Sequence, residues 1–116
     1  MKKAIIVGGK GLIGRGLIEE LIKKKIPILI LGTSKNISKN LKIKDKNIQY
    51  HQLKDKKSWY ENSIENIKKK FPTNDCVFFN LAWKGQSELT NGVIEDQLKN
   101  VHFSCRLIKL AKELGV

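Results

Sequence analysis

The sequence predicts an α/β fold built around a parallel sheet, and three observations carry this prediction. Short apolar runs, typical of strands covered on both faces, alternate along the chain with segments of helical periodicity. Gly8, Gly11 and Gly14 follow the first apolar run and precede the first helical segment, so the backbone can turn sharply and approach a diphosphate there. The 116 residues allow at most one domain. A single α/β unit is therefore expected.

The N-terminal half is expected to contain three strands and one helix. Residues 3–8 and 28–31 are apolar runs, and residues 47–53 show a weaker strand pattern. Residues 12–25 have helical periodicity, and a polar loop is expected over residues 32–46. The apolar stripe of this helix comprises Leu12, Ile13, Leu17, Ile18, Leu21 and Ile22. The order strand, helix, strand, strand follows for this half.

The C-terminal half is expected to add two helices and one buried strand. Ser58 begins a capping box, Ser-Trp-Tyr-Glu, for a helix that runs to about residue 71. Residues 75–81 form the fourth strand, a loop covers 83–91, and the last helix covers 93–114. That helix carries two apolar stripes, of which one should cover the sheet. The stripes are Ile94, Leu98, Val101, Cys105 and Ile108 on one face, and Phe103, Leu107, Leu110 and Leu114 on the other.

Alternation of this kind predicts parallel strands joined by right-handed crossovers. The expected fold is a Rossmann-type, doubly wound parallel sheet, incomplete at four strands in the order 3-2-1-4, with a ligand crevice at the carboxyl ends of strands one and four. The chain stops where a fifth strand should begin, which would leave strand four as an unpaired hydrophobic edge. Residues 1–116 are therefore expected to be the N-terminal part of a larger Rossmann domain. The rest of that domain and a substrate-binding domain would be absent from this stretch.

The charge and hydropathy of the sequence indicate whether the chain binds nucleic acid or a membrane. The formal net charge is +12, but Arg15 and Arg106 are the only arginines, and the lysines are dispersed rather than gathered in a binding stripe. Two lysine runs, residues 23–25 and 68–70, close expected helices, where cations favour the negative end of the helix dipole. No apolar run approaches the ~20 residues that span a bilayer. We therefore expect a cytoplasmic chain without nucleic-acid or membrane partners.

The cysteines and histidines form no expected metal site. Cys76 and Cys105 lack metal-ligand spacing and lie in apolar segments, so both are expected to be buried free thiols. His51 and His102 have no paired ligands, and each is expected to be a surface or packing residue. No metal ligand is therefore assigned.

Three segments carry a family resemblance. Residues 7–14 read Val-Gly-Gly-Lys-Gly-Leu-Ile-Gly, residues 77–83 read Val-Phe-Phe-Asn-Leu-Ala-Trp, and Asn100 and Val101 precede a Leu- and Ala-containing segment over 107–116. They resemble the Thr-Gly-x-x-Gly-x-x-Gly fingerprint, the strand-four signature and the following Asn-Val-x-Gly-Thr helix of the extended short-chain dehydrogenase/reductase family, the NAD-dependent epimerases and dehydratases. The three matches lie in the family's order and spacing and cover the whole chain.

The resemblance implies the N-terminal, NAD(P)-binding part of an oxidoreductase or isomerase. Such an epimerase, dehydratase or reductase would act on a nucleotide-activated sugar by hydride transfer to the nicotinamide. A non-catalytic relative that binds NAD(P) as a redox sensor is the alternative, and the sequence beyond Val116 would separate the two. In this family one face of the last helix often packs against its counterpart in a homodimer. Burial by the rest of the domain would explain a second apolar stripe equally well.

Carried over by position, the glycines define the expected diphosphate site. Gly8, Gly11 and Gly14 would turn around the pyrophosphate, with the amides of Leu12 and Ile13 as donors. The alternative for Gly11 and Gly14 is close packing between helix and strand.

The nicotinamide side of the cofactor is expected along the end of strand four. Leu81, Ala82 and Trp83 would lie beside the ribose and nicotinamide, and Asn100 would approach from the last helix. Ordinary strand-end packing is the alternative for Trp83. A polar position near a helix start is the alternative for Asn100.

The sequence departs from the family pattern at the end of strand two. Gly32 replaces the acidic residue that would bind the adenosine ribose hydroxyls. The absence of that carboxylate leaves room for a 2′-phosphate. Lys10 and Lys35, with Thr33 and Ser34, could neutralise it. NADP is therefore preferred slightly over NAD as the expected cofactor.

Two further departures concern the turn and the adenine. Gln52, followed by Leu53, takes the place of the Asp that would meet the adenine amino group, and its carbonyl oxygen could still accept that hydrogen bond. Val7 replaces the threonine before the first glycine, which removes a hydroxyl that braces the turn.

The family's catalytic pair, Tyr-x-x-x-Lys on a helix with a nearby Ser or Thr, has no expected counterpart here. Tyr50 and Lys54 fit the spacing, but they precede strand four and lie on an expected strand. A strand would separate them by about 13 Å, whereas a helix places such a pair on one face. No catalytic residue is therefore assigned, and the chain alone is expected to bind rather than catalyse.

Overall fold

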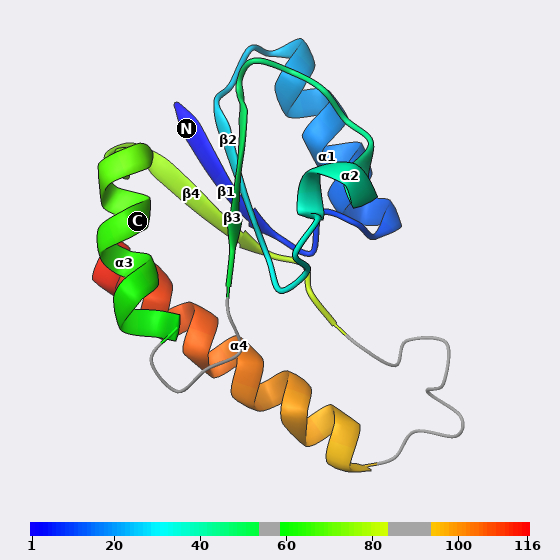
Figure 1. Ribbon diagram of the computed structural model, residues 1–116, viewed down its shortest axis with the longest axis vertical. Coiled ribbons are helices and arrows are strands. Elements are labelled where there is room, and N and C mark those ends of the chain that lie inside the picture. The colour runs from blue at the N-terminus through cyan, green and yellow to red at the C-terminus, as the bar shows by residue number, and fades with distance from the viewer. Residues whose placement is uncertain (54–58, 84–93) are drawn as a thin grey trace.

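Strands and helices alternate along the chain, as the sequence predicts except between the second and third strands, where no helix was expected. The computed structural model describes residues 1–53, 59–83 and 94–116 (Figure 1). The elements in chain order are β1 (Lys3–Val7), α1 (Leu12–Lys23), β2 (Ile28–Gly32), α2 (Ile37–Leu41), β3 (Ile48–Gln52), α3 (Trp59–Lys70), β4 (Cys76–Asn80) and α4 (Ile94–Leu114). The expected capping box at Ser58 lies outside the described residues, as does most of the expected loop over 83–91.

The sheet confirms the predicted topology. Its four strands run parallel in the order β3-β2-β1-β4. β1 and β2 lie in the middle and are almost completely buried, as their continuous apolar sequences predict. β4 was expected to be buried along its length, and this is wrong: only Cys76 is buried, and Val77 is 39% exposed. The physical reason is position, because β4 pairs with β1 alone and forms an edge of the sheet.

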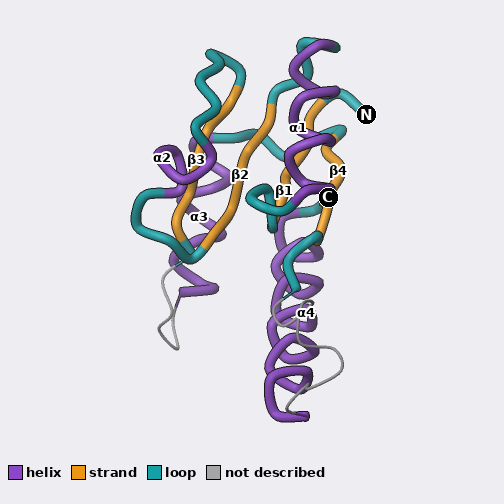
Figure 2. Tube along the Cα trace, turned by 90° about the vertical axis from the view of Figure 1, so that its right-hand side faces the viewer, coloured by secondary structure: helices purple, strands orange, loops and turns teal. Residues whose placement is uncertain are grey.

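Helices cover the two faces of the sheet (Figures 1 and 2), and a layer of apolar side chains lies under the helices on each face. Side chains of β1 alternate between them, since successive residues of a strand point to opposite faces: Ile5 joins the layer under α3 and α4, and Ile6 joins the layer under α1 and α2. Residues of α4 fill the first layer through Leu107, and residues of α1 fill the second through Ile18. The helices on both faces hold the sheet in place, and with it the carboxyl ends of β1, β2 and β4.

Only one of the two apolar stripes on α4 covers the sheet. Leu107, Leu110 and Leu114 are at most 2% exposed, and Phe103 packs against them. The other stripe is exposed over the described residues: Ile94, Leu98, Val101 and Ile108 are 49–77% exposed. Figure 2 shows that the N-terminal half of this helix extends beyond the ends of the strands. The occupant of the exposed stripe, a second copy or the rest of the domain, stays a prediction.

Both cysteines are free, but only one of them is buried. Cys76 faces the core, whereas Cys105 is exposed, so the expectation of two buried thiols is wrong for Cys105. The cause is that Cys105 belongs to the α4 stripe that points away from the sheet. Burial raises the pKa of the Cys76 thiol, which keeps that thiol protonated and unreactive.

The segment expected to be a polar loop contains a short helix, α2. Ile37 and Leu41 are buried in the layer that α1 also covers, and their i, i+4 spacing is the sequence signal for this turn of helix. Lys42, in the left-handed conformation at φ 52°, ends the helix with an N–H that donates to Ser38 O. α2 places polar residues beside the end of β2.

The first turn of α1 is more exposed than its apolar sequence predicts. Leu12 is 91% and Ile13 is 74% exposed, although both were assigned to the buried stripe. The buried stripe begins only at Leu17, because the helix starts directly after the glycine loop that follows the carboxyl end of β1. The helix also ends two residues before the expected position, where Lys25 takes φ 56°.

A polar contact joins β3 to α3. His51 Nε2 lies 3.2 Å from Ser63 Oγ, and Ser63 is only 3% exposed. Burial of the imidazole, and to a smaller extent the charge of Lys70, lowers the pKa of His51. His51 is thus a packing residue, one of the two roles expected for it.

The lowered pKa of His51 makes stability depend on pH. The unfolded chain binds the proton more readily than the folded chain, so stability is full above the ordinary histidine pKa of about 6.5 and falls as the pH drops below it. His51→Gln cannot titrate and should flatten the fall in melting temperature between about pH 7 and pH 5. The exposed His102, changed to Gln, is the control. Equal declines in the wild type and the His51 variant would contradict this account.

None of the helices within residues 1–53, 59–83 and 94–116 combines the length and apolar character needed to cross a bilayer.

Candidate functional site

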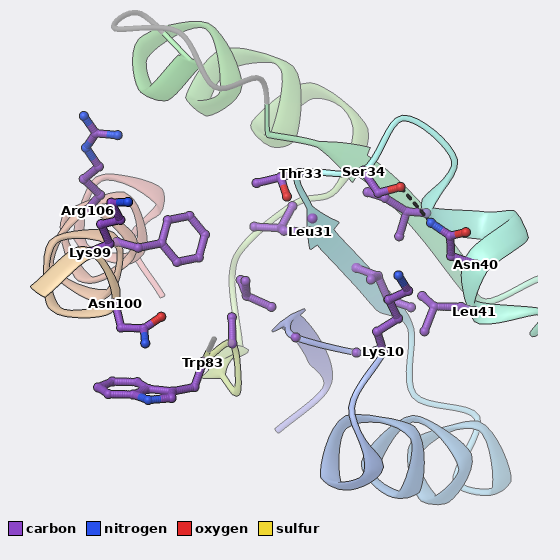
Figure 3. Close-up of a pocket in the computed structure, with 18 of the residues that line it drawn as sticks. Lys10, Leu31, Thr33, Ser34, Asn40, Leu41, Trp83, Lys99, Asn100 and Arg106 are labelled. Carbon is purple, nitrogen blue, oxygen red and sulfur yellow. Dashed lines mark hydrogen bonds between the residues drawn. The ribbon is translucent and has the colours of Figure 1, made fainter. Parts of the chain in front are cut away.

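One pocket lies where the carboxyl ends of β1 and β2 and the residues after β4 meet (Figure 3). Its volume is about 660 Å³. The glycine loop after β1 forms its floor, α2 and the residues after β2 form one wall, and the N-terminal half of α4 forms the other. The crevice therefore lies where the strand order predicts it.

The structure brings about half of the predicted site residues to the surface of this pocket. Those that line it are Gly8, Lys10, Thr33, Ser34, Ala82, Trp83 and Asn100. Those that do not line it are Gly11, Leu12, Ile13, Gly14, Lys35, Gln52, Leu53 and Leu81.

The three fingerprint glycines differ in what a side chain at each position would meet. Gly8 takes φ +88°, and a Cβ there would lie 2.5 Å from Ala82 N, so this position needs glycine for both backbone conformation and close approach. A Cβ on Gly14 would collide with Gly8 O and lie 2.7 Å from Gly9 Cα. A Cβ on Gly11 would meet nothing nearer than Gly8 O at 3.7 Å. Close packing therefore accounts for Gly14 and does not account for Gly11.

The N-terminus of α1 presents unshielded N–H groups next to this loop. Gly11 is the N-cap residue and supplies no side-chain cap, and the first turn contains no acidic residue. Arg15 N donates to Gly11 O at 3.0 Å, so the preceding amides of Leu12, Ile13 and Gly14 come before the first intrahelical donor. With the positive end of the helix dipole behind them, these amides form a site suited to an anion.

The end of β2 is crowded at the point where a side chain on residue 32 would begin. A Cβ on Gly32 would lie 3.2 Å from Ile37 Cδ1, because α2 packs over this position. Next to it, Asn40 Nδ2 donates to Ser34 Oγ at 2.7 Å. Figure 3 shows this pair at the pocket wall, across the pocket from α4. Lys35 is exposed and does not reach the pocket.

Gln52 and Leu53, the residues at the end of β3 that were predicted to lie beside the adenine, are hydrogen-bonded to the end of β2. Gln52 Nε2 donates to Thr33 O at 3.2 Å, and Leu53 N donates to Gly32 O at 2.7 Å. The Gln52 amide nitrogen is thus engaged, and its carbonyl oxygen remains as an acceptor. Leu53 is 1% exposed, so its side chain belongs to the core rather than to the pocket.

Hydrogen bonds fix the chain that leaves β4. Leu81 N donates to Val7 O at 2.8 Å, which continues the pairing with β1, and Ala82 N donates to Asn80 Oδ1 at 3.3 Å. Trp83 Nε1 donates to Gln97 Oε1 of α4 at 3.1 Å. The indole is therefore anchored at the mouth of the pocket by its polar end, with 43% of the residue exposed.

The α4 wall contains functional candidates that the sequence did not reveal. These are Asp96, Lys99, His102, Phe103 and Arg106, which line the pocket together with the buried Asn100. Their spacing of three or four residues, which places them on one helical face, was the only signal available. On the opposite wall, Ile37, Asn40 and Leu41 were missed because residues 32–46 were expected to be a loop.

The charges of the pocket favour an anionic ligand. Lys10, Lys99 and Arg106 line it, and Asp96 is the acidic residue among its described lining residues. Asp96 Oδ1 lies 3.7 Å from Lys99 Nζ, so these two charges largely offset each other. Lys10 and Arg106 then leave the pocket with a positive balance.

The described residues bring no catalytic Tyr-Lys pair together. Tyr50 lies on β3, as expected, and its hydroxyl donates to Ile43 O at 2.8 Å. Burial raises the pKa of this phenol, the opposite of what a catalytic tyrosine base requires. Lys54 lies outside the described residues.

The chain matches one protein family in sequence and a solved epimerase in structure. The sequence model of the NAD dependent epimerase/dehydratase family matches residues 4–116. Among solved structures, an epimerase from the thermophilic pseudomurein-containing methanogen Methanothermobacter thermautotrophicus is similar, with a TM-score of 0.69 at 21% identity. The match covers 99% of this chain and 33% of that one, so this chain spans about one third of that epimerase's length. No curated protein matches the chain.

Proposed function

The chain belongs to the NAD-dependent epimerase/dehydratase family, and on that premise we propose that it forms the NAD(P)-binding part of an epimerase, dehydratase or reductase. Family membership implies a nucleotide cofactor. The observation that carries the proposal is the uncapped N-terminus of α1 beside the glycine loop. A dinucleotide diphosphate fits such amides without further charged partners.

The described residues fit the two halves of a dinucleotide. The amides of Leu12 and Ile13 would hold the diphosphate, with Gly11 leaving the space in front of them open. Trp83 and Asn100 would bound the nicotinamide half at the mouth of the pocket. When bound, the nicotinamide ring supplies a carbon that accepts and returns a hydride.

The adenosine half would lie against the end of β2. Gly32 offers no carboxylate to the ribose, and Lys10 lines the same pocket, which supports NADP over NAD. Lys35 would contribute only from outside the pocket wall. The Gln52 carbonyl oxygen would accept from the adenine amino group.

The chemistry of the whole protein is proposed from the family alone. A nucleotide-activated sugar would be the substrate, and its hydroxyl-bearing carbon would exchange a hydride with the nicotinamide. The described residues would bind and orient the cofactor. The proton-transferring groups would come from sequence beyond them.

Fluorescence titration of the purified protein with NADPH and with NADH tests the proposal. We expect saturable binding of both, tighter for NADPH. Absence of saturable binding to either would contradict the proposed function. Equal affinities, or a preference for NADH, would contradict the NADP assignment alone.

A further inference from the structure

On the wall of the pocket formed by the end of β2 and α2, the Ser34 hydroxyl is arranged as a hydrogen-bond donor to a ligand. Ser34 Oγ accepts from Asn40 Nδ2 at 2.7 Å and from Asn36 N at 3.4 Å. A hydroxyl has two acceptor lone pairs and one hydrogen. Both lone pairs of Ser34 are therefore engaged, and its O–H hydrogen is the group left to interact with a ligand.

The surroundings of Ser34 suit a phosphate better than a ribose hydroxyl. Lys10 contributes an ammonium group to the same pocket, and the acidic lining residue Asp96 stands on α4 beside Lys99. A ribose hydroxyl is best held by a group that accepts its hydrogen, whereas a phosphate monoester only accepts hydrogen bonds at neutral pH. A Cβ at position 32 would also crowd the Ile37 side chain, at 3.2 Å from its Cδ1 atom.

We propose that Asn40 is a positioning residue for cofactor choice: its amide holds the Ser34 hydroxyl as a donor to the 2′-phosphate of NADP. The inference rests on the proposed dinucleotide function and adds to it a residue of α2 that no family pattern led us to expect. Asn40 is half-buried and lines the pocket, so it is held in place and still faces the ligand.

Asn40→Asp is the sharpest variant, because it reverses the hydrogen bond at nearly constant shape. The carboxylate introduced by this substitution would accept the Ser34 hydrogen, which would remove the donor and add a negative charge beside the phosphate. We expect the Kd for NADPH to rise about tenfold or more and the Kd for NADH to change by less than about threefold.

Asn36→Asp provides a matched control within the same turn. Asn36 contributes its backbone N–H to Ser34 and does not line the pocket, so its side chain can change without breaking the bond. This variant introduces the same charge change at the N-cap of α2, where Asp is a favourable residue. The ratio of the NADPH and NADH affinities should stay as in the wild type.

Ser34→Ala tests the same bond from the other partner. It should weaken NADPH binding by less than Asn40→Asp does, because it removes the donor without adding a negative charge. The double variant should bind NADPH about as weakly as Asn40→Asp alone, because the donor can be lost only once. A wild-type preference for NADPH that survives both single variants would overturn the inference and leave the proposed function standing. Failure of the wild type to bind either dinucleotide would instead contradict the proposed function.

Discussion

A Gly11→Asp variant is expected to melt at a higher temperature than the wild-type protein and to lose dinucleotide binding. Gly11 is the N-cap of α1, at φ −73° and ψ 169°, a conformation that suits any L-residue and the N-cap aspartates in particular. The introduced carboxylate would cap the free amides and interact favourably with the helix dipole, for a gain of about 0.5–1 kcal/mol. It would also occupy the place of the diphosphate with a like charge, so we expect binding to weaken at least about 100-fold.

Gly11→Asn separates the steric effect from the electrostatic one. Asn caps helices about as well as Asp but carries no charge. It should stabilise α1 by less than Asp does and still obstruct the diphosphate. Thermal melting by circular dichroism and NADPH titration give the two readouts. Retention of wild-type affinity in either variant would contradict the assignment of the diphosphate to this helix.

Gly14→Ala is expected to destabilise the protein by about 3 kcal/mol, a large overpacking effect. The added methyl group would collide with Gly8 O and crowd Gly9 Cα, and both of these are backbone atoms that cannot rotate away. The helix and the glycine loop would have to separate. Urea unfolding followed by far-ultraviolet circular dichroism measures the loss.

Gly16→Ala is the matched substitution on the same helix. A Cβ at Gly16 would have nothing within 4 Å, so the only effect is that of helix propensity. The variant should gain up to about 1 kcal/mol. Two Gly-to-Ala changes two residues apart thus have opposite expected signs. Equal effects would show that the close approach at Gly14 does not limit stability.

The sheet was predictable because its signals are local. Continuous apolar runs mark strands covered on both faces, as in Ile28–Gly32, and the glycines fix the turn that follows β1. The strand order then follows from general rules of parallel connection. The predicted strand order already places β4 at an edge of the sheet, but the partial exposure that follows from an edge position was not predicted.

Helix faces were harder to predict, because an amphipathic pattern does not say which neighbour a stripe will meet. α4 has two apolar stripes, and only packing decides that Leu107 faces the sheet while Ile108 faces outward. The same limit explains Cys105. α2 was missed because two buried residues, Ile37 and Leu41, are too few to outweigh the polar composition around them.

The site shows the same division between local and long-range information. The loop from Gly8 to Lys10 was recognisable from its spacing. On the α4 wall only Asn100 was recognised, since Arg106 and its other neighbours reach the pocket through the packing of the helix and not through a sequence motif. Lys35, adjacent to Ser34 in sequence, is exposed and does not line the pocket. Sequence neighbours in a loop can thus differ in which surface they reach.

The location of the diphosphate can be measured directly through the amide groups proposed to bind it. At 13.2 kDa, the chain is suited to two-dimensional ¹H–¹⁵N correlation spectroscopy during titration with NADPH. We predict that the largest shift changes occur at the amides of Gly11, Leu12, Ile13 and Gly14. Changes concentrated instead at the lysine-rich residues 39–46, with those four amides unmoved, would contradict the account.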